Sequence, residues 1–157
     1  MKSKIRVLIV DDSLTIRAMI AALFEKDPEI KVVGVAASAE EADEMLHHLA
    51  PDVITLDIKM PGMNGLEFLS HLKTWHDKPV IMLSSLSAMG APERLEALQR
   101  GAVGSFNKAN AIKDAPKLIK MIKDAAHGRL KADAEDAAAL ALVAAQQQGA
   151  LPLYAAA

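Results

Sequence analysis

Short apolar runs alternate with longer amphipathic stretches along the first 127 residues of the chain. The first run, residues 5–10, is continuously apolar, as expected for a strand buried on both faces of a parallel sheet. An apolar stripe at helical spacing follows it, and this pair of patterns recurs four more times. The alternation predicts five βα units around one parallel sheet, with strands over residues 5–10, 31–36, 53–57, 79–83 and 102–107.

Local signals predict where the intervening helices begin and end. Ser13 is a candidate N-cap of the first helix, and Ser38 with Glu41 forms a capping box for the second, which Pro51 should end. A loop rich in proline and glycine precedes the third helix. The last three helices are expected around residues 66–72, from Pro92 to Gly101 and from Asp114 to His127.

The composition changes after residue 127. Residues 128–157 are rich in alanine, with a glutamine run at 146–148 and few large apolar side chains. We therefore divide the chain into a domain at 1–127 and a tail or linker at 128–157, flexible or partly helical. A docking helix around residues 132–145 and a vector-derived end are the alternatives.

Charge and composition exclude several classes of protein. The 18 basic and 20 acidic residues are scattered, so no basic stripe indicates nucleic-acid binding. No stretch approaches the roughly 20 apolar residues of a membrane span, and the amino-terminal run is too short for a signal peptide. The absence of cysteine excludes disulfides and thiolate metal sites. We expect a cytoplasmic protein that is a monomer or weak dimer.

Polar residues follow the predicted strands where those strands end. Asp11 and Asp12 follow the first strand, Asp57 ends the third, Ser84 follows the fourth and Lys108 follows the fifth. The carboxyl ends of parallel strands meet at one edge of the sheet, where ligands bind in open α/β folds. Three carboxylates gathered there would repel one another unless a cation lay among them, and Mg²⁺ prefers oxygen ligands of this kind.

Each of these residues also has an ordinary structural interpretation. Asp11 and Asp12 could cap the following helix, and Asp57 could begin a turn. Ser84 alone is more often a solvated hydroxyl, and Lys108 alone a surface charge. The joint placement of all five at one sheet edge is what favours a site for phosphate and metal.

Four motifs resemble the receiver domains of two-component response regulators, in the same order and on the same predicted elements. They are VLIVDDS at 7–13, ITLDIKMPGMNGLEFL at 54–69, PVIMLSS at 79–85 and GAVGSFNK at 101–108. The resemblance covers residues 4–127. Within the family the chain looks most like the receiver half of the chemotaxis methylesterase, without its esterase half.

The resemblance implies a flavodoxin-like (βα)5 doubly wound sandwich with a five-stranded parallel sheet of order 2-1-3-4-5. It also implies that Asp57 accepts the phosphoryl group. Direct Mg²⁺ ligands would be Asp12, Asp57 and the backbone carbonyl of Lys59, and Asp11 would hold metal-bound water. Ser84 and Lys108 would each bind a phosphoryl oxygen.

The function implied is that of a single-domain response regulator. It would take a phosphoryl group from a histidine kinase or a histidine phosphotransfer protein and alter its binding to a downstream protein, with no reaction beyond its own phosphorylation and dephosphorylation. A phosphate sink and a truncated methylesterase regulator are alternatives. A metal-dependent phosphatase would want a carboxylate where Lys59 stands, and a nucleotide-binding module would want a glycine-rich loop after the first strand.

Several positions depart from the family pattern. Ala109 replaces the usual proline after the lysine, so we expect a trans peptide bond and a shifted loop there, because a non-proline cis bond costs about 3 kcal/mol. Ser105 stands where the family has an aromatic switch residue, with Phe106 expected on the core side. Lys59 could pair with a site carboxylate or remain solvated. Leu86 offers no polar group for an attacking water, which predicts slow self-hydrolysis.

Overall fold

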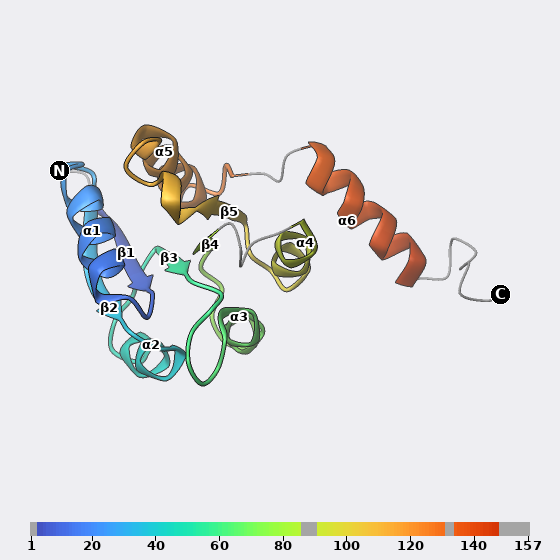
Figure 1. Ribbon diagram of the computed structural model, residues 1–157, viewed down its shortest axis with the longest axis horizontal. Helices are drawn as coiled ribbons and strands as arrows, with labels where there is room; N and C mark the ends of the chain where they lie inside the picture. Colours follow the sequence, from blue (N-terminus) through green and yellow to red (C-terminus); the bar gives the residue numbers. More distant parts are fainter. Residues whose placement is uncertain (1–2, 86–90, 131–133, 148–157) are drawn as a thin grey trace.

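The computed structural model describes residues 3–85, 91–130 and 134–147. Five strands form one sheet in the order β2-β1-β3-β4-β5, and all neighbours are parallel (Figure 1). The strands are β1 (Ile5–Val10), β2 (Ile30–Ala36), β3 (Val53–Leu56), β4 (Val80–Ser84) and β5 (Gly104–Asn107). The predicted fold class and strand order are confirmed.

Helices cover both faces of this sheet (Figure 1). They are α1 (Leu14–Glu25), α2 (Ala39–Leu46), α3 (Gly65–Leu72), α4 (Ala91–Gln99) and α5 (Ala115–Ala126), and a further helix, α6 (Ala134–Gln147), lies beside α4. Helices α1 and α5 bury Phe24, Ile122 and their neighbours against one face. Helices α2, α3 and α4 bury Phe68, Leu69 and theirs against the other. The central strands β1, β3 and β4 are thus enclosed on both sides, as the continuous apolar run of β1 predicted, whereas the edge strands β2 and β5 are partly exposed.

Side-chain caps fix the starts of three helices. Ser13, Ser38 and Asn64 each accept a hydrogen bond from the backbone N–H three residues further on, at 3.3, 3.1 and 2.9 Å. The first two caps were predicted and are confirmed, whereas the cap on α3 was not foreseen. Asp114 precedes α5 but makes no cap hydrogen bond.

Several element boundaries differ from the sequence-based expectation: β2 begins at Ile30 rather than at residue 31, and β4 spans Val80–Ser84 rather than residues 79–83. Strand β3 ends at Leu56, so Asp57 lies one residue beyond it, and β5 begins at Gly104 rather than at residue 102. Helix α2 ends at Leu46 and does not continue to Pro51. The N–H of His47 donates to the carbonyl three residues back at 3.2 Å, and this tighter turn closes the helix early.

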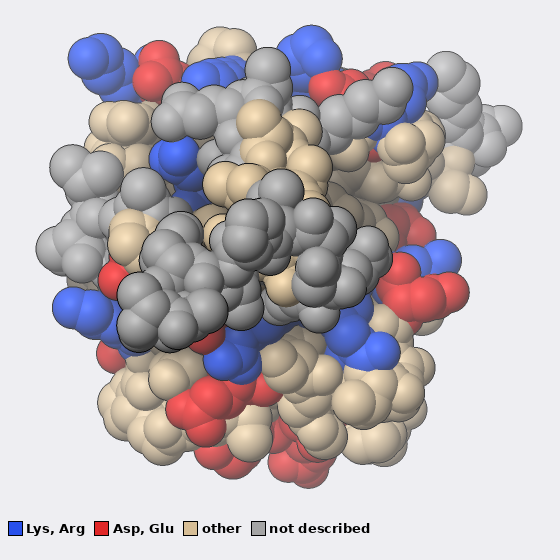
Figure 2. All heavy atoms as spheres, turned by 90° about the vertical axis from the view of Figure 1, so that its right-hand side faces the viewer, with Lys and Arg blue, Asp and Glu red and all other residues tan. Residues whose placement is uncertain are grey.

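The carboxy-terminal segment forms a helix that lies beside α4 (Figure 1). A helix at 134–147 fits both the partly helical tail and the docking helix of the sequence analysis. The division at residue 127 stays a prediction, and the tail beyond residue 147 lies outside the described residues. On the face in Figure 2, acidic and basic side chains are interspersed. No helix in the described part of the chain has the length and hydropathy needed to cross a bilayer.

Candidate functional site

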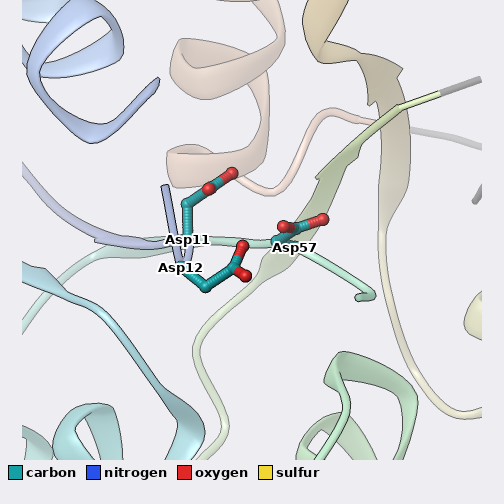
Figure 3. Close-up of side chains that lie close together, drawn as sticks. All are labelled: Asp11, Asp12 and Asp57. Carbon is teal, nitrogen blue, oxygen red and sulfur yellow. The ribbon is translucent and has the colours of Figure 1, made fainter. Parts of the chain in front are cut away.

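Three carboxylates converge at the carboxyl edge of the sheet (Figure 3). Asp11 and Asp12 lie in the turn between β1 and α1, and Asp57 directly follows β3. One carboxylate oxygen from each lies within 4.8 Å of those of the other two. Asp11 and Asp57 are only 3% and 2% exposed, whereas Asp12 is exposed. The cluster is therefore buried on the protein side and reached from solvent on the Asp12 side.

Backbone hydrogen bonds hold these residues at the sheet edge. The N–H of Asp57 donates to the carbonyl of Val10 at 2.9 Å, and the N–H of Asp11 donates to the carbonyl of Ala36 at 3.0 Å. The ladder thus continues one residue past β1 and β3. This continuation fixes the direction in which both buried carboxylates leave the backbone.

Ser84 and Lys108 complete the cluster. The Ser84 hydroxyl donates to Oδ1 of Asp57 at 2.7 Å, and the Lys108 ammonium donates to Oδ2 of Asp57 at 3.1 Å. The same ammonium donates to Oδ2 of Asp11 at 2.9 Å. Both Asp57 oxygens therefore have a donor, and Lys108 bridges two buried carboxylates.

Lys108 reaches this position from a short 3₁₀ turn after β5, spanning Lys108–Asn110. The Asn107 side chain accepts the Ala109 N–H at 3.0 Å and caps the turn. No peptide bond in the described ranges is cis, so the bond before Ala109 is trans, as predicted. Burial lowers the pKa of Lys108, but hydrogen bonding to Asp11 and the charges of Asp57 and Asp11 outweigh it and raise the pKa above its ordinary value. Lys108 is thus a permanent cation at physiological pH.

Lys59 does not join the cluster through its side chain. It is exposed and makes no hydrogen bond or ion pair within the described part of the chain. It lines a surface depression beside Asp12, together with Pro61 and Asn64. The solvated interpretation of Lys59 therefore describes the structure, and the role of its backbone carbonyl remains a prediction.

Two further residues support the site and were missed in the sequence. A Cβ on Gly65 would lie 1.9 Å from the carbonyl oxygen of Asp57, so the start of α3 approaches the end of β3 more closely than any residue but glycine allows. Arg17 donates from its guanidinium to the carbonyl of Asp11 at 2.8 Å. The spacing in NGLE indicates a helix start but not this close approach, and no sequence signal links Arg17 to Asp11.

The structure tests only some of the expectations for the residues near Lys108 and Ser84. Phe106 is 7% exposed and packs in the core with α1 and α5, as expected, whereas Ser105 is half-buried on the same strand. Leu86, on which the expectation of slow hydrolysis depends, lies outside the described residues.

The donor set suits a hard divalent cation. The three gathered side chains offer oxygen atoms only, and Mg²⁺ typically uses one or two carboxylates and keeps several waters. Asp12 is exposed and lines the surface depression beside the cluster. The ammonium of Lys108 between Asp11 and Asp57 shows that this cluster already attracts positive charge.

Comparisons with known proteins identify the family. A model described as the response regulator receiver domain matches residues 7–123. The chain belongs to the response regulator receiver family. It is 44% identical over 118 residues to a protein-glutamate methylesterase/protein-glutamine glutaminase 2 of Vibrio vulnificus, an alignment that covers 75% of this chain and 34% of the relative.

Solved receiver structures share the fold. The crystal structure of the response regulator domain of Thermotoga maritima CheB matches with a TM-score of 0.74 and 40% identity, covering 79% of this chain and 97% of that one. A chain in the crystal structure of the P1 domain of CheA3 in complex with CheY6 from R. sphaeroides matches with a TM-score of 0.66 and 36% identity, covering 78% and 96%. The matched region spans 27–40% of the length of the curated relatives it matches.

Proposed function

We propose that this receiver accepts a phosphoryl group on the carboxylate of Asp57, with Mg²⁺ held by Asp11, Asp12 and Asp57. The observation that carries the proposal is the environment of Asp57. Its carboxylate is 2% exposed, both its oxygens are bonded by the donors Ser84 and Lys108, and two further carboxylates lie within 4.8 Å. A nucleophile, two phosphate-binding donors and a metal-binding set are thus in one place.

The chemistry is phosphoryl transfer between a histidine donor and an aspartate acceptor. An Asp57 oxygen attacks phosphorus and forms the new P–O bond, while the P–N bond of a phosphohistidine breaks and its electron pair stays on the imidazole nitrogen. Bound Mg²⁺ would neutralise charge on the transferring phosphoryl group. Because both Asp57 oxygens carry a donor before the reaction, Ser84 or Lys108 must exchange its bond to the carboxylate for one to the phosphoryl group.

Lys108 offsets repulsion during this exchange. An incoming phosphoryl group adds about −1.5 to −2 charge beside three carboxylates. Burial alone would lower the pKa of Lys108, but the hydrogen bond to Asp11 and the charges of Asp57 and Asp11 raise it above its ordinary value. The ammonium therefore carries its positive charge when the phosphoryl group arrives. The lysine therefore supplies a fixed positive charge at the point where negative charge is added.

We propose a protein as the physiological phosphodonor, because two large apolar side chains are exposed close to the site. Leu14, at the start of α1, is 73% exposed, and Ile112, just after the Lys108 turn, is 69% exposed. Exposed apolar side chains beside a buried nucleophile suit contact with a helix that carries a phosphohistidine. Leu14→Ser and Ile112→Ser should slow transfer from a histidine kinase but leave phosphorylation by acetyl phosphate unchanged. Leu142→Ser, at a 52% exposed leucine on α6, is the matched control.

The output we propose is a phosphorylation-dependent change in binding to a protein. Ser84 ends β4, and the chain continues from it to α4, which lies beside α6. We therefore propose that a change at Ser84 alters the surface that α4 and α6 present to a partner, without an aromatic side chain at residue 105. A phosphate sink would instead exchange phosphoryl groups with its kinase and show no partner whose affinity depends on phosphorylation.

The proposal is tested by intact mass spectrometry after incubation with acetyl phosphate and Mg²⁺. Wild type should gain one labile phosphoryl group and Asp57→Asn none. Asp114→Asn is the control, because Asp114 is an exposed aspartate that makes no cap hydrogen bond. Equal labelling of wild type and Asp57→Asn would refute Asp57 as the acceptor.

A further inference from the structure

Asp11 is held by four hydrogen bonds from four parts of the fold. Its N–H bonds to β2, and its two carboxylate oxygens accept from the Ser13 N–H at 2.9 Å and from Lys108 at 2.9 Å. The fourth bond is to its backbone carbonyl, which accepts from the guanidinium of Arg17 at 2.8 Å. Arg17 thus reaches the backbone of this turn with its side chain from the first turn of α1.

Asp12 has no comparable support. Its side chain is exposed and makes no hydrogen bond or ion pair with any described residue. Its carboxylate is nevertheless turned toward the end of β3 that carries Asp57 (Figure 3). The direction of Asp12 is therefore set by the backbone of the turn, and the peptide unit between Asp11 and Asp12 is the one whose oxygen Arg17 holds.

We propose that Arg17 is a positioning residue of the Mg²⁺ site, a role that rests on the function proposed above. Arg17 lies in the first turn of α1, where its own N–H donates to the Ser13 carbonyl at 2.9 Å. Its side chain reaches back from that turn to the Asp11 carbonyl and ties the first turn of the helix to the loop. By fixing this peptide unit, Arg17 aims the Asp12 carboxylate at the metal position.

The sign of the effect separates this role from a purely electrostatic one. Arg17 carries a positive charge near the site, so removal of that charge alone would strengthen binding of a divalent cation. Loss of a group that orients a metal ligand instead weakens metal affinity, commonly by about 10- to 100-fold. Arg17→Met should therefore raise the dissociation constant for Mg²⁺ by about tenfold, against the electrostatic trend.

The single hydrogen bond also predicts which substitution restores binding. Only one guanidinium nitrogen of Arg17 contacts the Asp11 carbonyl, so the contact does not use the two-pronged geometry that only arginine provides. A lysine ammonium can donate one such bond. Arg17→Lys should therefore recover most of the Mg²⁺ affinity that Arg17→Met loses.

The experiment is a Mg²⁺ titration of wild type, Arg17→Met and Arg17→Lys, followed by amide chemical shifts, with thermal unfolding measured in parallel. Arg6→Met is the matched control, because Arg6 also donates to a backbone carbonyl, that of Ala50 at 3.1 Å, but at the other end of β1. Arg6→Met should leave Mg²⁺ binding unchanged. With acetyl phosphate as donor, Arg17→Met should need more Mg²⁺ for half-maximal phosphorylation yet approach the wild-type rate at saturation.

Each other outcome has a distinct meaning. Unchanged or tighter Mg²⁺ binding by Arg17→Met would overturn the positioning role and leave the proposed function intact. A reduced maximal rate at saturating Mg²⁺ would also overturn it, because Arg17 would then act on the reaction itself. A wild-type protein that binds no Mg²⁺ would overturn the proposed function and this inference together.

Discussion

Substitution of Gly65 by alanine tests how closely α3 approaches the end of β3, where Asp57 lies. A Cβ there would lie 1.9 Å from the carbonyl oxygen of Asp57 and 2.9 Å from Cα of Ile58. Carbon and carbonyl oxygen ordinarily approach no closer than about 3.3 Å. The obstructing atoms are backbone, so no side chain can rotate away, and the start of α3 must move by more than about 1 Å.

This movement breaks a specific interaction. The N–H of Gly65 donates to the carbonyl of Ile58 at 2.7 Å, and Gly65 is buried. An unsatisfied buried backbone group costs about 1–3 kcal/mol. Movement of α3 would also loosen the packing of Leu66 and Leu69 in the core, which adds to that cost. Alanine ordinarily stabilises a helix relative to glycine by only about 0.5–1 kcal/mol. We therefore expect a net loss of about 3 kcal/mol in the free energy of unfolding, which lowers Tm by roughly 6–12 °C.

The same displacement should impair phosphorylation. A shift of about 1 Å in a reacting group can cost about 100-fold in rate. Urea unfolding and the initial rate of labelling by acetyl phosphate measure the two effects. Gly104→Ala is the control, because its Cβ would meet only the flexible ends of Leu130 and Met121, at 3.0 and 3.2 Å. If Gly65→Ala were as stable and as fast as Gly104→Ala, the argument from close approach would be wrong.

Three other predictions concern residues outside the site. The Thr55 hydroxyl is buried without a hydrogen-bond partner among the described residues. Because Thr55→Val removes this unsatisfied group, it should raise the free energy of unfolding by about 1 kcal/mol. A lower free energy of unfolding for Thr55→Val, measured in urea, would contradict this. Burial, followed by the nearby charge of Lys73, lowers the pKa of His76 below 6.5. The stability that His76 contributes is therefore fully present above pH 6.5 and is lost as the pH falls through the lower folded-state pKa. Below pH 6.5, the Tm of wild type should therefore depend on pH more strongly than the Tm of His76→Gln. An NMR titration that placed the His76 pKa at or above 6.5 would contradict the prediction. Leu140 is half-buried on α6 and Leu142 is exposed, so Leu140→Glu should speed hydrogen exchange in α4 more than Leu142→Glu; equal rates would count against packing of α6 on α4.

The sheet and its helices could be predicted because their signals are local. A continuous apolar run indicated β1, short apolar runs between helical patterns indicated the other strands, and Ser13 and Ser38 stood at the position of an N-cap. The order of the strands came from the resemblance to receivers, and the structure has the same order. The early end of α2 could not be predicted, because the three residues before Pro51 also fit a helical stripe. The helix ends where the last turn tightens, and no pattern in the sequence marks that position.

The candidate site was predictable only where its residues follow strands. Asp11, Asp57 and Lys108 could be placed at one edge because parallel strands bring their carboxyl ends together. Gly65 and Arg17 act through distances between elements that no spacing in the sequence specifies. The short turn that carries Lys108 depends on a cap by Asn107, and it brings the lysine to both carboxylates although proline is absent after it.

The most direct measurement of the central claim is the location of the phosphoryl group in the chain. Wild type would be treated with acetyl phosphate and Mg²⁺, reduced with borohydride to trap any aspartyl phosphate, and mapped by peptide mass spectrometry. We expect one modified residue, Asp57, in a reaction that requires Mg²⁺. Modification of Asp11, Asp12 or Ser84 in place of Asp57, or no modification at all, would contradict it.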